Sequence, residues 1–224
     1  MTDLLNVALR DELLDMVEED QAMRREALKD PSAYRPDVDH RHTKRMKQII
    51  DEHGFPGKSQ VEPGGAKAAW LLIQHADHEP GFQQRCLPLI YEAGLLGEIE
   101  LERYAYLEDR VRLNSNRNQL YGTQWRVMEP TRISVRPLED AARVDELRAN
   151  SGIPPLRKLL TEGLAEIYSI QVLKCGPSNL KIELEDLEGR LTRAHVVEGE
   201  TIYDIQMEWG DNNLEVCVIG VGTY

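Results

Sequence analysis

The segment that decides the fold is residues 65–80, GAKAAWLLIQHADHEP. Its first part is apolar on every side of a helix, which is typical of a helix surrounded by other helices. We therefore predict a central helix over residues 65–78. The polar run Gln74-His75-Ala76-Asp77-His78 follows the apolar part directly, and Glu79-Pro80 ends this helix and opens the next one. A dense polar group is thus expected at a corner between two packed helices.

Apolar residues at helical spacing extend on both sides of this segment, up to about Gly163. They predict further helices over residues 6–29, 39–53, 80–93, 99–113, 138–150 and 155–164, with a strand over residues 119–125. From Ile167 onward the spacing changes, because apolar and polar residues alternate and turn-forming residues separate the runs. This change in period marks the predicted boundary between two domains.

The two patterns together predict an α+β fold. We expect an N-terminal all-α, bundle-like domain over residues 1–164, followed by a C-terminal antiparallel β-meander of five strands over residues 165–224. Residues 165–224 contain 11 acidic and four basic side chains. The outer face of the predicted sheet is therefore expected to be acidic.

The composition excludes several classes of protein. The 224 residues are 41% hydrophobic and 29% charged, and they contain no run of about 18 apolar residues that would predict a membrane span. The net charge of −12 disfavours binding to nucleic acid and to anionic membranes. The first residues do not resemble a secretory signal, and the three cysteines are widely separated, so reduced thiols and a cytoplasmic location are expected.

Two charged residues fall within the apolar arc of the first predicted helix. Asp20 and Arg24 are four residues apart, so their side chains can pair on the helix surface. Burial would require each of them to be hydrogen-bonded or neutralised. Two interpretations remain open, namely a structural ion pair and a pair that anchors a substrate at a polar site.

Histidines occur on two of the predicted helices. His42 and His53 follow the apolar stripe of the helix over residues 39–53, which favours a structural role, whereas His40 points away from the stripe and is expected to be solvated. His75 and His78 are three residues apart, so they could share a metal, relay a proton or bind a carboxylate. A metal site would need at least one further ligand, and no metal site is assigned.

Asp77 lies between His75 and His78 and is expected to orient a histidine, because a carboxylate that accepts an imidazole N–H fixes the tautomer. The alternative is that Asp77 caps a helix while the histidines interact with the helix C-terminus. Tyr121-Gly122-Thr123-Gln124 is a polar turn that brings a hydroxyl and an amide within reach of a pocket.

Five short motifs occur in this chain in combination. They are Glu19-Asp20-Gln21 with Arg24, Gln74-His75-Ala76-Asp77-His78, Arg85-Cys86-Leu87-Pro88-Leu89, Asp109-Arg110-Val111 and Tyr121-Gly122-Thr123-Gln124. In this combination the chain resembles an uncharacterised, largely actinobacterial family of bacterial proteins, a domain of unknown function. The resemblance covers roughly residues 10 to 160 and implies a mainly helical domain, and it carries over no established activity and no catalytic residue.

The function predicted from these residues is that of a small-molecule enzyme, hydrolase- or lyase-like, with an acid–base site. The expected catalytic residues are His75, Asp77 and His78. The expected substrate-binding residues are Asp20, Gln21, Arg24, Gln74, Tyr121 and Gln124. In this hypothesis Arg24 and Gln21 hold an anionic or amide group while His75, oriented by Asp77, transfers a proton; the cofactor is left open.

The alternative function is a non-enzymatic binding or immunity-type protein. In that case the acidic sheet over residues 165–224 would engage a basic protein partner, with a salt-dependent affinity. A third interpretation is that the sheet only covers apolar surface of the helices.

Overall fold

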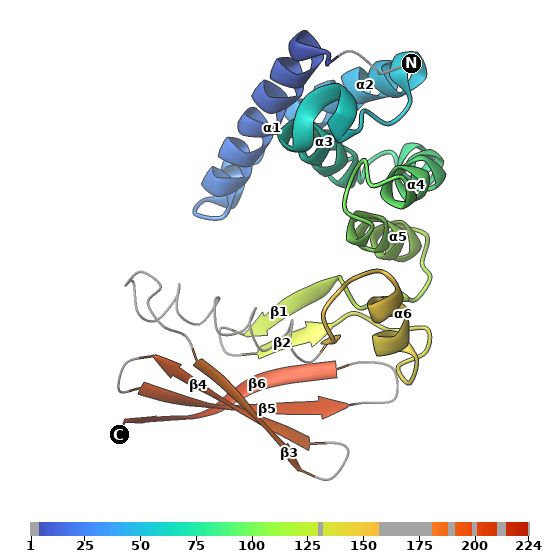
Figure 1. The fold of residues 1–224 in the computed structure, drawn as a ribbon. Helices are drawn as coiled ribbons and strands as arrows, with labels where there is room; N and C mark the ends of the chain where they lie inside the picture. Colours follow the sequence, from blue (N-terminus) through green and yellow to red (C-terminus); the bar gives the residue numbers. More distant parts are fainter. Residues whose placement is uncertain are drawn as a thin grey trace. The chain divides into compact units, whose positions relative to one another are not determined.

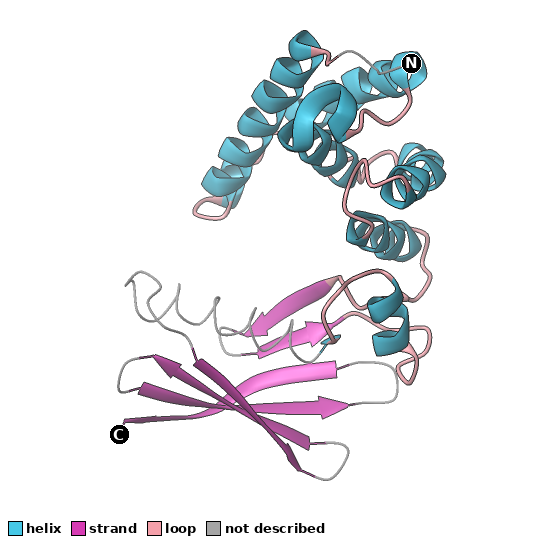
Figure 2. Cartoon of the chain, in the orientation of Figure 1, coloured by secondary structure: helices cyan, strands magenta, loops and turns pink. Residues whose placement is uncertain are grey.

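The computed structural model describes residues 5–129, 132–156, 181–187, 191–198, 201–209 and 214–223. The chain forms two compact units, Met1–Asn116 and Arg117–Tyr224. Figure 1 shows that the first unit is built from helices and that the second contains the strands. Figure 2 shows the same division by secondary structure.

The first unit contains five α-helices and a short 3-10 helix. They are α1 (Val7–Ala27), η1 (Pro31–Ala33), α2 (Pro36–His53), α3 (Lys58–Gln74), α4 (Pro80–Leu95) and α5 (Glu102–Asn114). The side chain of Asn6 caps α1 by accepting the backbone N–H of Leu9 at 3.0 Å, as expected of an Asn at this position. Pro36 begins α2 three residues before the predicted start, because proline suits the first turn of a helix.

Helix α3 is the centre of this unit, as predicted from its apolar run. It packs against α1, α2, α4 and α5, and Ala69 and Ile73 are fully buried. The indole N–H of Trp70 donates to the backbone carbonyl of Arg103 at 2.9 Å, which satisfies the polar atom of a buried ring. The helix begins earlier than predicted, at Lys58, with a break in its backbone at Val61 and Glu62.

The corner between α3 and α4 forms where the sequence places it. Helix α3 ends at Gln74, and the backbone N–H of Ala76 donates to the carbonyl of Ile73 at 3.1 Å. Glu79 then donates to the carbonyl of Ala76 at 2.9 Å, and α4 begins at Pro80. Residues 75–79 therefore form a tight turn instead of the last turn of the predicted helix.

The second unit contains one described helix, α6 (Val144–Asn150), and a sheet. The strands are β1 (Trp125–Glu129), β2 (Arg132–Val135), β3 (Lys181–Leu187), β4 (Leu191–Glu198), β5 (Thr201–Trp209) and β6 (Leu214–Thr223). Their order in the sheet is β1-β2-β6-β5-β4-β3. Every neighbouring pair is antiparallel.

The predicted fold class, an all-α domain followed by a five-stranded β-meander, is wrong. Strands β1 and β2 come from the part of the chain that precedes α6, and β2 pairs with β6, so the sheet is not a meander confined to the tail. Among the described residues from 181 onward the strands are β3, β4, β5 and β6. The physical reason is that an unpaired edge of β6 recruits a hairpin from earlier in the chain.

Two further predicted elements differ from the structure, and two other predictions fall on residues outside the described ones. Residues 119–124 are not a strand, because the side chain of Gln119 bonds both the N–H and the carbonyl of Gln124 at 3.0 Å and holds a loop before β1. The helix predicted over residues 138–150 begins only at Val144. The predicted domain boundary at residues 164 and 165, and most of the helix predicted over residues 155–164, lie outside the described residues.

Candidate functional site

A cavity of about 300 Å³ lies in the helical unit beside the α3–α4 corner. Three parts of the chain line it: α1, the connection into α2 with the first turns of that helix, and the corner itself. The lining residues are Arg24, Tyr34, Pro36, Asp39, His40, His75, Asp77 and His78. This volume is at the lower end for small-molecule sites.

Asp20 holds His75 at the wall of this cavity. The Nδ1 atom of His75 lies 3.0 Å from Oδ1 and 2.9 Å from Oδ2 of Asp20. The carboxylate side chain is 1% exposed and the imidazole is 16% exposed. A carboxylate accepts the Nδ1–H of a histidine and thereby makes Nε2 the basic nitrogen of the neutral ring. No residue in the described part of the chain bonds Nε2, so this nitrogen is available to a ligand.

The surroundings of Asp20 favour its charged form. Burial raises the pKa of this carboxyl, but the hydrogen bond and charge of His75 oppose that effect, and Gln21 and Arg24 add to the opposition. The net result is a pKa below the ordinary value. Gln21 donates to Oδ2 at 2.7 Å and Arg24 donates to Oδ1 at 3.0 Å, so Asp20 is an ionised acceptor of three side chains.

Arg24 connects Asp20 with a second buried carboxylate. Its Nε donates to Asp20, and its Nη2 donates to Oδ1 of Asp39 at 2.8 Å. The hydroxyl of Tyr34 donates to the other oxygen of Asp39, and this hydrogen bond, together with burial, raises the pKa of Tyr34. Within the described residues Nη1 of Arg24 has no partner, and the side chain is 28% exposed. Two nitrogens of the Arg24 guanidinium are therefore held by carboxylates, and Nη1 is open to a ligand.

Asp77 is not the partner of either histidine. Its oxygens accept from Nε of Arg110 at 2.7 Å, from Nη2 of the same guanidinium, and from Nδ2 of Asn114 at 3.0 Å. Burial raises the pKa of Asp77, but Arg110 above all outweighs it, so the pKa lies below the ordinary value. Asp77 thus connects the corner to α5, while the orienting role expected of it belongs to Asp20, 55 positions from His75 in the chain.

His78 stacks on His40 at the same cavity. The ring centroids are 4.1 Å apart and the rings are inclined by 36°. Burial and the neighbouring His40 lower the pKa of His78. His40 is exposed, as expected, yet it lines the cavity.

The remaining predicted binding residues lie apart from the cavity wall or in the other unit. Gln74 is buried, its Nε2 lies 3.5 Å from the carbonyl of Tyr106, and its Oε1 has no partner in the described part of the protein. Tyr121 and Gln124 belong to the second unit, so their contact with substrate stays a prediction. The predicted binding residues Asp20, Gln21 and Arg24 all belong to α1. The side chains of Gln21 and Arg24 both donate to Asp20.

Sequence reasoning missed two residues that shape the cavity, Tyr34 and Asp39. Tyr34 lies in the connection before α2, and Asp39 lies in the first turn of that helix. Pro36 signals the true helix start, which places Asp39 in the first turn and not at the helix end that the sequence predicts. From the sequence, Arg110 was named only as part of the Asp109-Arg110-Val111 motif, and no role was predicted for it.

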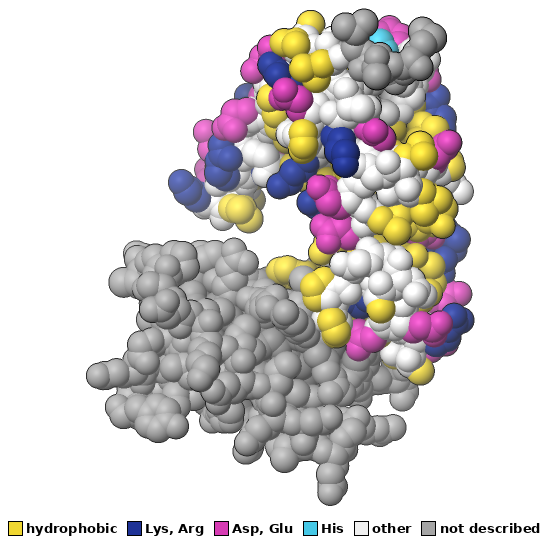
Figure 3. Space-filling model, in the orientation of Figure 1, with side chains coloured by type: hydrophobic (Ala, Val, Ile, Leu, Met, Phe, Trp, Pro, Cys, Tyr) yellow, Lys and Arg dark blue, Asp and Glu magenta, His cyan; other side chains and the backbone are white. Residues whose placement is uncertain are grey.

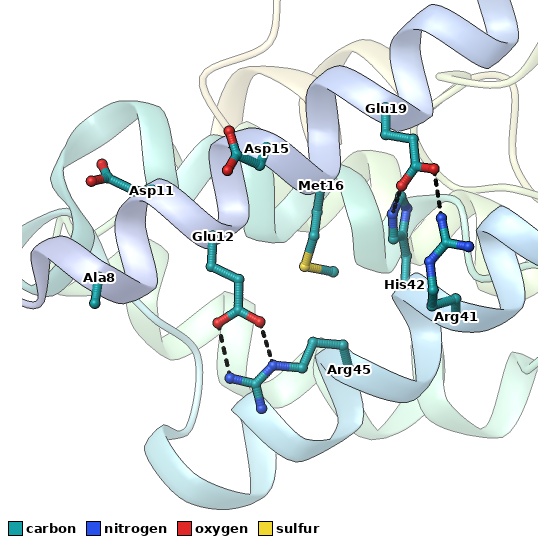
Figure 4. A pocket seen from close by; sticks show the side chains of 9 residues that line it. All are labelled: Ala8, Asp11, Glu12, Asp15, Met16, Glu19, Arg41, His42 and Arg45. Carbon is teal, nitrogen blue, oxygen red and sulfur yellow. Dashed lines mark hydrogen bonds and ion pairs between the residues drawn. The ribbon is translucent and has the colours of Figure 1, made fainter.

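A second cavity, of about 670 Å³, lies between α1 and α2 (Figure 4). Its basic side chains are already paired: Arg45 bonds both oxygens of Glu12 at 2.5 and 2.9 Å, and Arg41 bonds Glu19 at 2.6 Å. Nε2 of His42 also contacts Glu19, at 3.0 Å. These pairs hold α2 against α1 and occupy the guanidinium groups of the cavity, and Nδ1 of His42 is buried without a partner among the described residues. No carboxylate in the described part of the chain orients an open imidazole nitrogen here as Asp20 does at His75, so the smaller cavity is the better candidate site.

No group of three or more His, Cys, Asp and Glu side chains among the described residues is placed to hold a metal ion. None of the described helices combines the length and the apolar character needed to cross a bilayer.

The fold and the site define the first unit as a helical domain with a carboxylate-oriented histidine at a small cavity. The chain belongs to the Family of unknown function (DUF6624), which it matches over residues 7–173. This agrees with the resemblance to an uncharacterised family. Neither the curated proteins nor the solved structures contain a match to the chain.

Proposed function

We propose that this protein is a small-molecule enzyme, hydrolase- or lyase-like, in which His75 is the general base and acid. The observation that carries the proposal is the pairing of His75 Nδ1 with both oxygens of buried Asp20 at the wall of a cavity. An imidazole held in this way keeps Nε2 in the basic form and is stabilised as imidazolium after it takes a proton. The role expected of Asp77 as the orienting carboxylate therefore passes to Asp20.

The proposed reaction uses three groups of the cavity. Nε2 of His75 removes a proton from a water molecule or from the substrate, and the charge of Asp20 stabilises the imidazolium. Nη1 of Arg24 donates to the oxygen on which negative charge develops. In hydrolysis the water oxygen bonds the electrophilic atom, the bond to the leaving group breaks, and His75 returns its proton to that group. In elimination His75 removes the proton from carbon, the electron pair of that C–H bond forms a double bond as the bond to the leaving group breaks, and His75 gives the proton to the leaving group.

The test is depletion of metabolites by the purified protein. Wild type, His75→Gln and His53→Gln are incubated with small-molecule extracts, which are then compared by mass spectrometry. His53 is the matched control because it lies at the end of α2 and does not line the cavity. We expect wild type and His53→Gln to consume the same compound, and His75→Gln to do so at least about 100-fold more slowly.

Labelled water then separates the two reaction types. A hydrolase places one oxygen from solvent in a product, whereas a lyase does not. Equal turnover by wild type and His75→Gln would refute the role of His75, and the absence of any compound consumed by wild type would refute the enzyme proposal.

The alternative function, capture of a basic partner by residues 165–224, depends on side chains that lie outside the described ones. It stays a prediction. The face of the helical unit in Figure 3 mixes acidic and basic side chains and offers no single-sign surface to such a partner.

A further inference from the structure

The cavity holds an unusual set of donors besides His75. Nη1 of Arg24 has no partner among the described residues, and the imidazoles of His40 and His78 line the same space. The two rings come from different elements, one from α2 and the other from the α3–α4 corner, and are stacked with centroids 4.1 Å apart. One permanent positive charge thus lies beside two stacked imidazoles, each of which can accept a proton.

The carboxylates around the cavity do not oppose a bound anion as free charges would. Asp39 accepts from Arg24 and Tyr34, and Asp77 accepts from Arg110 and Asn114. The oxygens of both carboxylates are thus occupied by donors, of which the guanidinium groups of Arg24 and Arg110 carry positive charge. An incoming anion therefore meets Arg24 and the histidines as the donors still able to bind it.

Protonation of the histidine pair depends on the charges that face it from every neighbouring element. Two neutral rings stack without repulsion, whereas two charged rings at this distance would repel each other. The surrounding charged and titratable groups are Arg24 from α1, Tyr34 from the connection, Asp39 and Lys47 from α2, and His75, Asp77 and Glu79 from the corner. Lys47 and Glu79 bond each other at 2.9 Å, so neither is a free charge beside the pair.

We propose that this cavity binds a tetrahedral oxyanion with two negative charges, as in a phosphate monoester, and that the His40–His78 pair takes up one proton from solvent when it binds. This inference rests on the proposed function, because it names the substrate class of the same site. Nη1 of Arg24 donates to one oxygen of the anion, and the proton taken up by the pair supplies positive charge beyond that of Arg24, which already bonds Asp20 and Asp39. A monoanionic carboxylate needs Arg24 alone and gains little from the pair.

The affinity of such a site must depend on pH. The bound dianion stabilises the protonated pair, so binding strengthens as the pH falls and the pair becomes easier to protonate. One linked proton changes the affinity by at most about tenfold per pH unit. Burial and His40 lower the pKa of His78 in the free protein, which favours the neutral form of this ring before the anion binds.

The test follows the histidine resonances of the whole chain by NMR during titration with sulfate. Sulfate keeps both charges from about pH 8 to about pH 6, so any pH dependence belongs to the protein. We expect saturable shifts at His40 and His78, an affinity about tenfold or more higher at the lower pH, and no such gain with acetate. His78→Gln should remove the pH dependence, whereas the control variant His53→Gln, at the end of α2, should retain it.

Arg24→Lys provides a second variant that keeps the charge but loses the guanidinium geometry, and its sulfate affinity should fall several-fold. The inference is overturned if sulfate produces no saturable shift, if His53 shifts as much as His78, or if His78→Gln binds with unchanged pH dependence. Turnover retained in His75→Gln beside normal sulfate binding would refute the proposed reaction alone. Loss of turnover in that variant without pH-linked binding would refute the oxyanion site alone.

Discussion

Replacement of Asp20 by Asn changes the charge at the most buried carboxylate of the site while keeping its shape. The side chain is 1% exposed and accepts hydrogen bonds from His75, Arg24 and Gln21. A hydrogen bond to a charged group contributes about 1.5–3 kcal/mol, and breaking a buried pair costs about 3–5 kcal/mol. In this variant Arg24 still bonds Asp39, and the side-chain oxygen of the new Asn still accepts one hydrogen bond. The free-energy cost of burying a charge at position 20 is also removed. We therefore expect Asp20→Asn to lower the unfolding free energy by about 2–3 kcal/mol near neutral pH.

The same change should impair catalysis beyond its effect on stability. The Asn amide can present its NH₂ to Nδ1 of His75, which places the ring proton on Nε2 and removes the base. An equivalent loss of the correct tautomer lowers kcat by about 10⁴-fold in serine proteases. We expect a decrease of roughly 10³- to 10⁴-fold here, with a ring-proton shift in the nitrogen NMR spectrum of His75.

Denaturant unfolding of four proteins provides the assay: wild type, Asp20→Asn, His75→Gln and the double variant. The double-mutant cycle should give a coupling free energy of about 1 kcal/mol or more between the two side chains. Asp77→Asn is the matched control, because this carboxylate is 45% exposed and its loss should cost less than that of Asp20. A coupling free energy near zero, or equal losses in Asp20→Asn and Asp77→Asn, would refute the assignment of Asp20 as the partner of His75.

Three further predictions follow from burial and charge. Burial raises the pKa values of the Asp20 and Asp77 carboxyls, but their hydrogen bonds outweigh this effect, so both pKa values lie below the ordinary one. The stability that the ionised carboxylates contribute is therefore present above about pH 4. It is lost as the pH falls through their lowered pKa values in the folded protein. Acid unfolding should show this loss, and Asp20→Asn should reduce it. Burial raises the pKa of Cys86 to about 12, so iodoacetamide should label it only after denaturation, as read by peptide mass spectrometry. Ile73→Ala, at a fully buried site of α3, should lower the unfolding free energy by about 2–4 kcal/mol in a denaturant titration, and a loss below about 0.5 kcal/mol would contradict the central placement of α3.

The sequence predicted the parts of the fold in which local pattern and burial agree. The apolar run Ala68–Ile73 faces other helices on all sides, so its composition alone indicates a central helix. Strands β1 and β2 were missed for the opposite reason. They are five and four residues long, which is too short for a two-residue period to stand out from loop sequence, and only their pairing with β6 makes them strands.

The site was predicted where its contacts lie within one helix. Asp20 and Arg24 form an i,i+4 pair, and that spacing is visible in the sequence. The partner of His75 was assigned to Asp77 because the two are neighbours in the chain, yet the backbone turn directs Asp77 to Arg110 of α5. Contacts between elements depend on the tertiary fold, which spacing along one helix does not encode.

Arg24 shows why variants of His75 carry more information about function than variants of the cation. The guanidinium bonds Asp20 and Asp39, which are 1% and 6% exposed, so its removal leaves two buried carboxylates with one donor fewer. A loss of activity in an Arg24 variant would therefore mix lost substrate binding with a weakened contact between α1 and α2. His75 is held at Nδ1 alone and is partly exposed, so its replacement by Gln alters the proton-transfer group while Arg24 still neutralises Asp20. Variants of His75 with Arg24 unchanged therefore separate an effect on catalysis from an effect on folding.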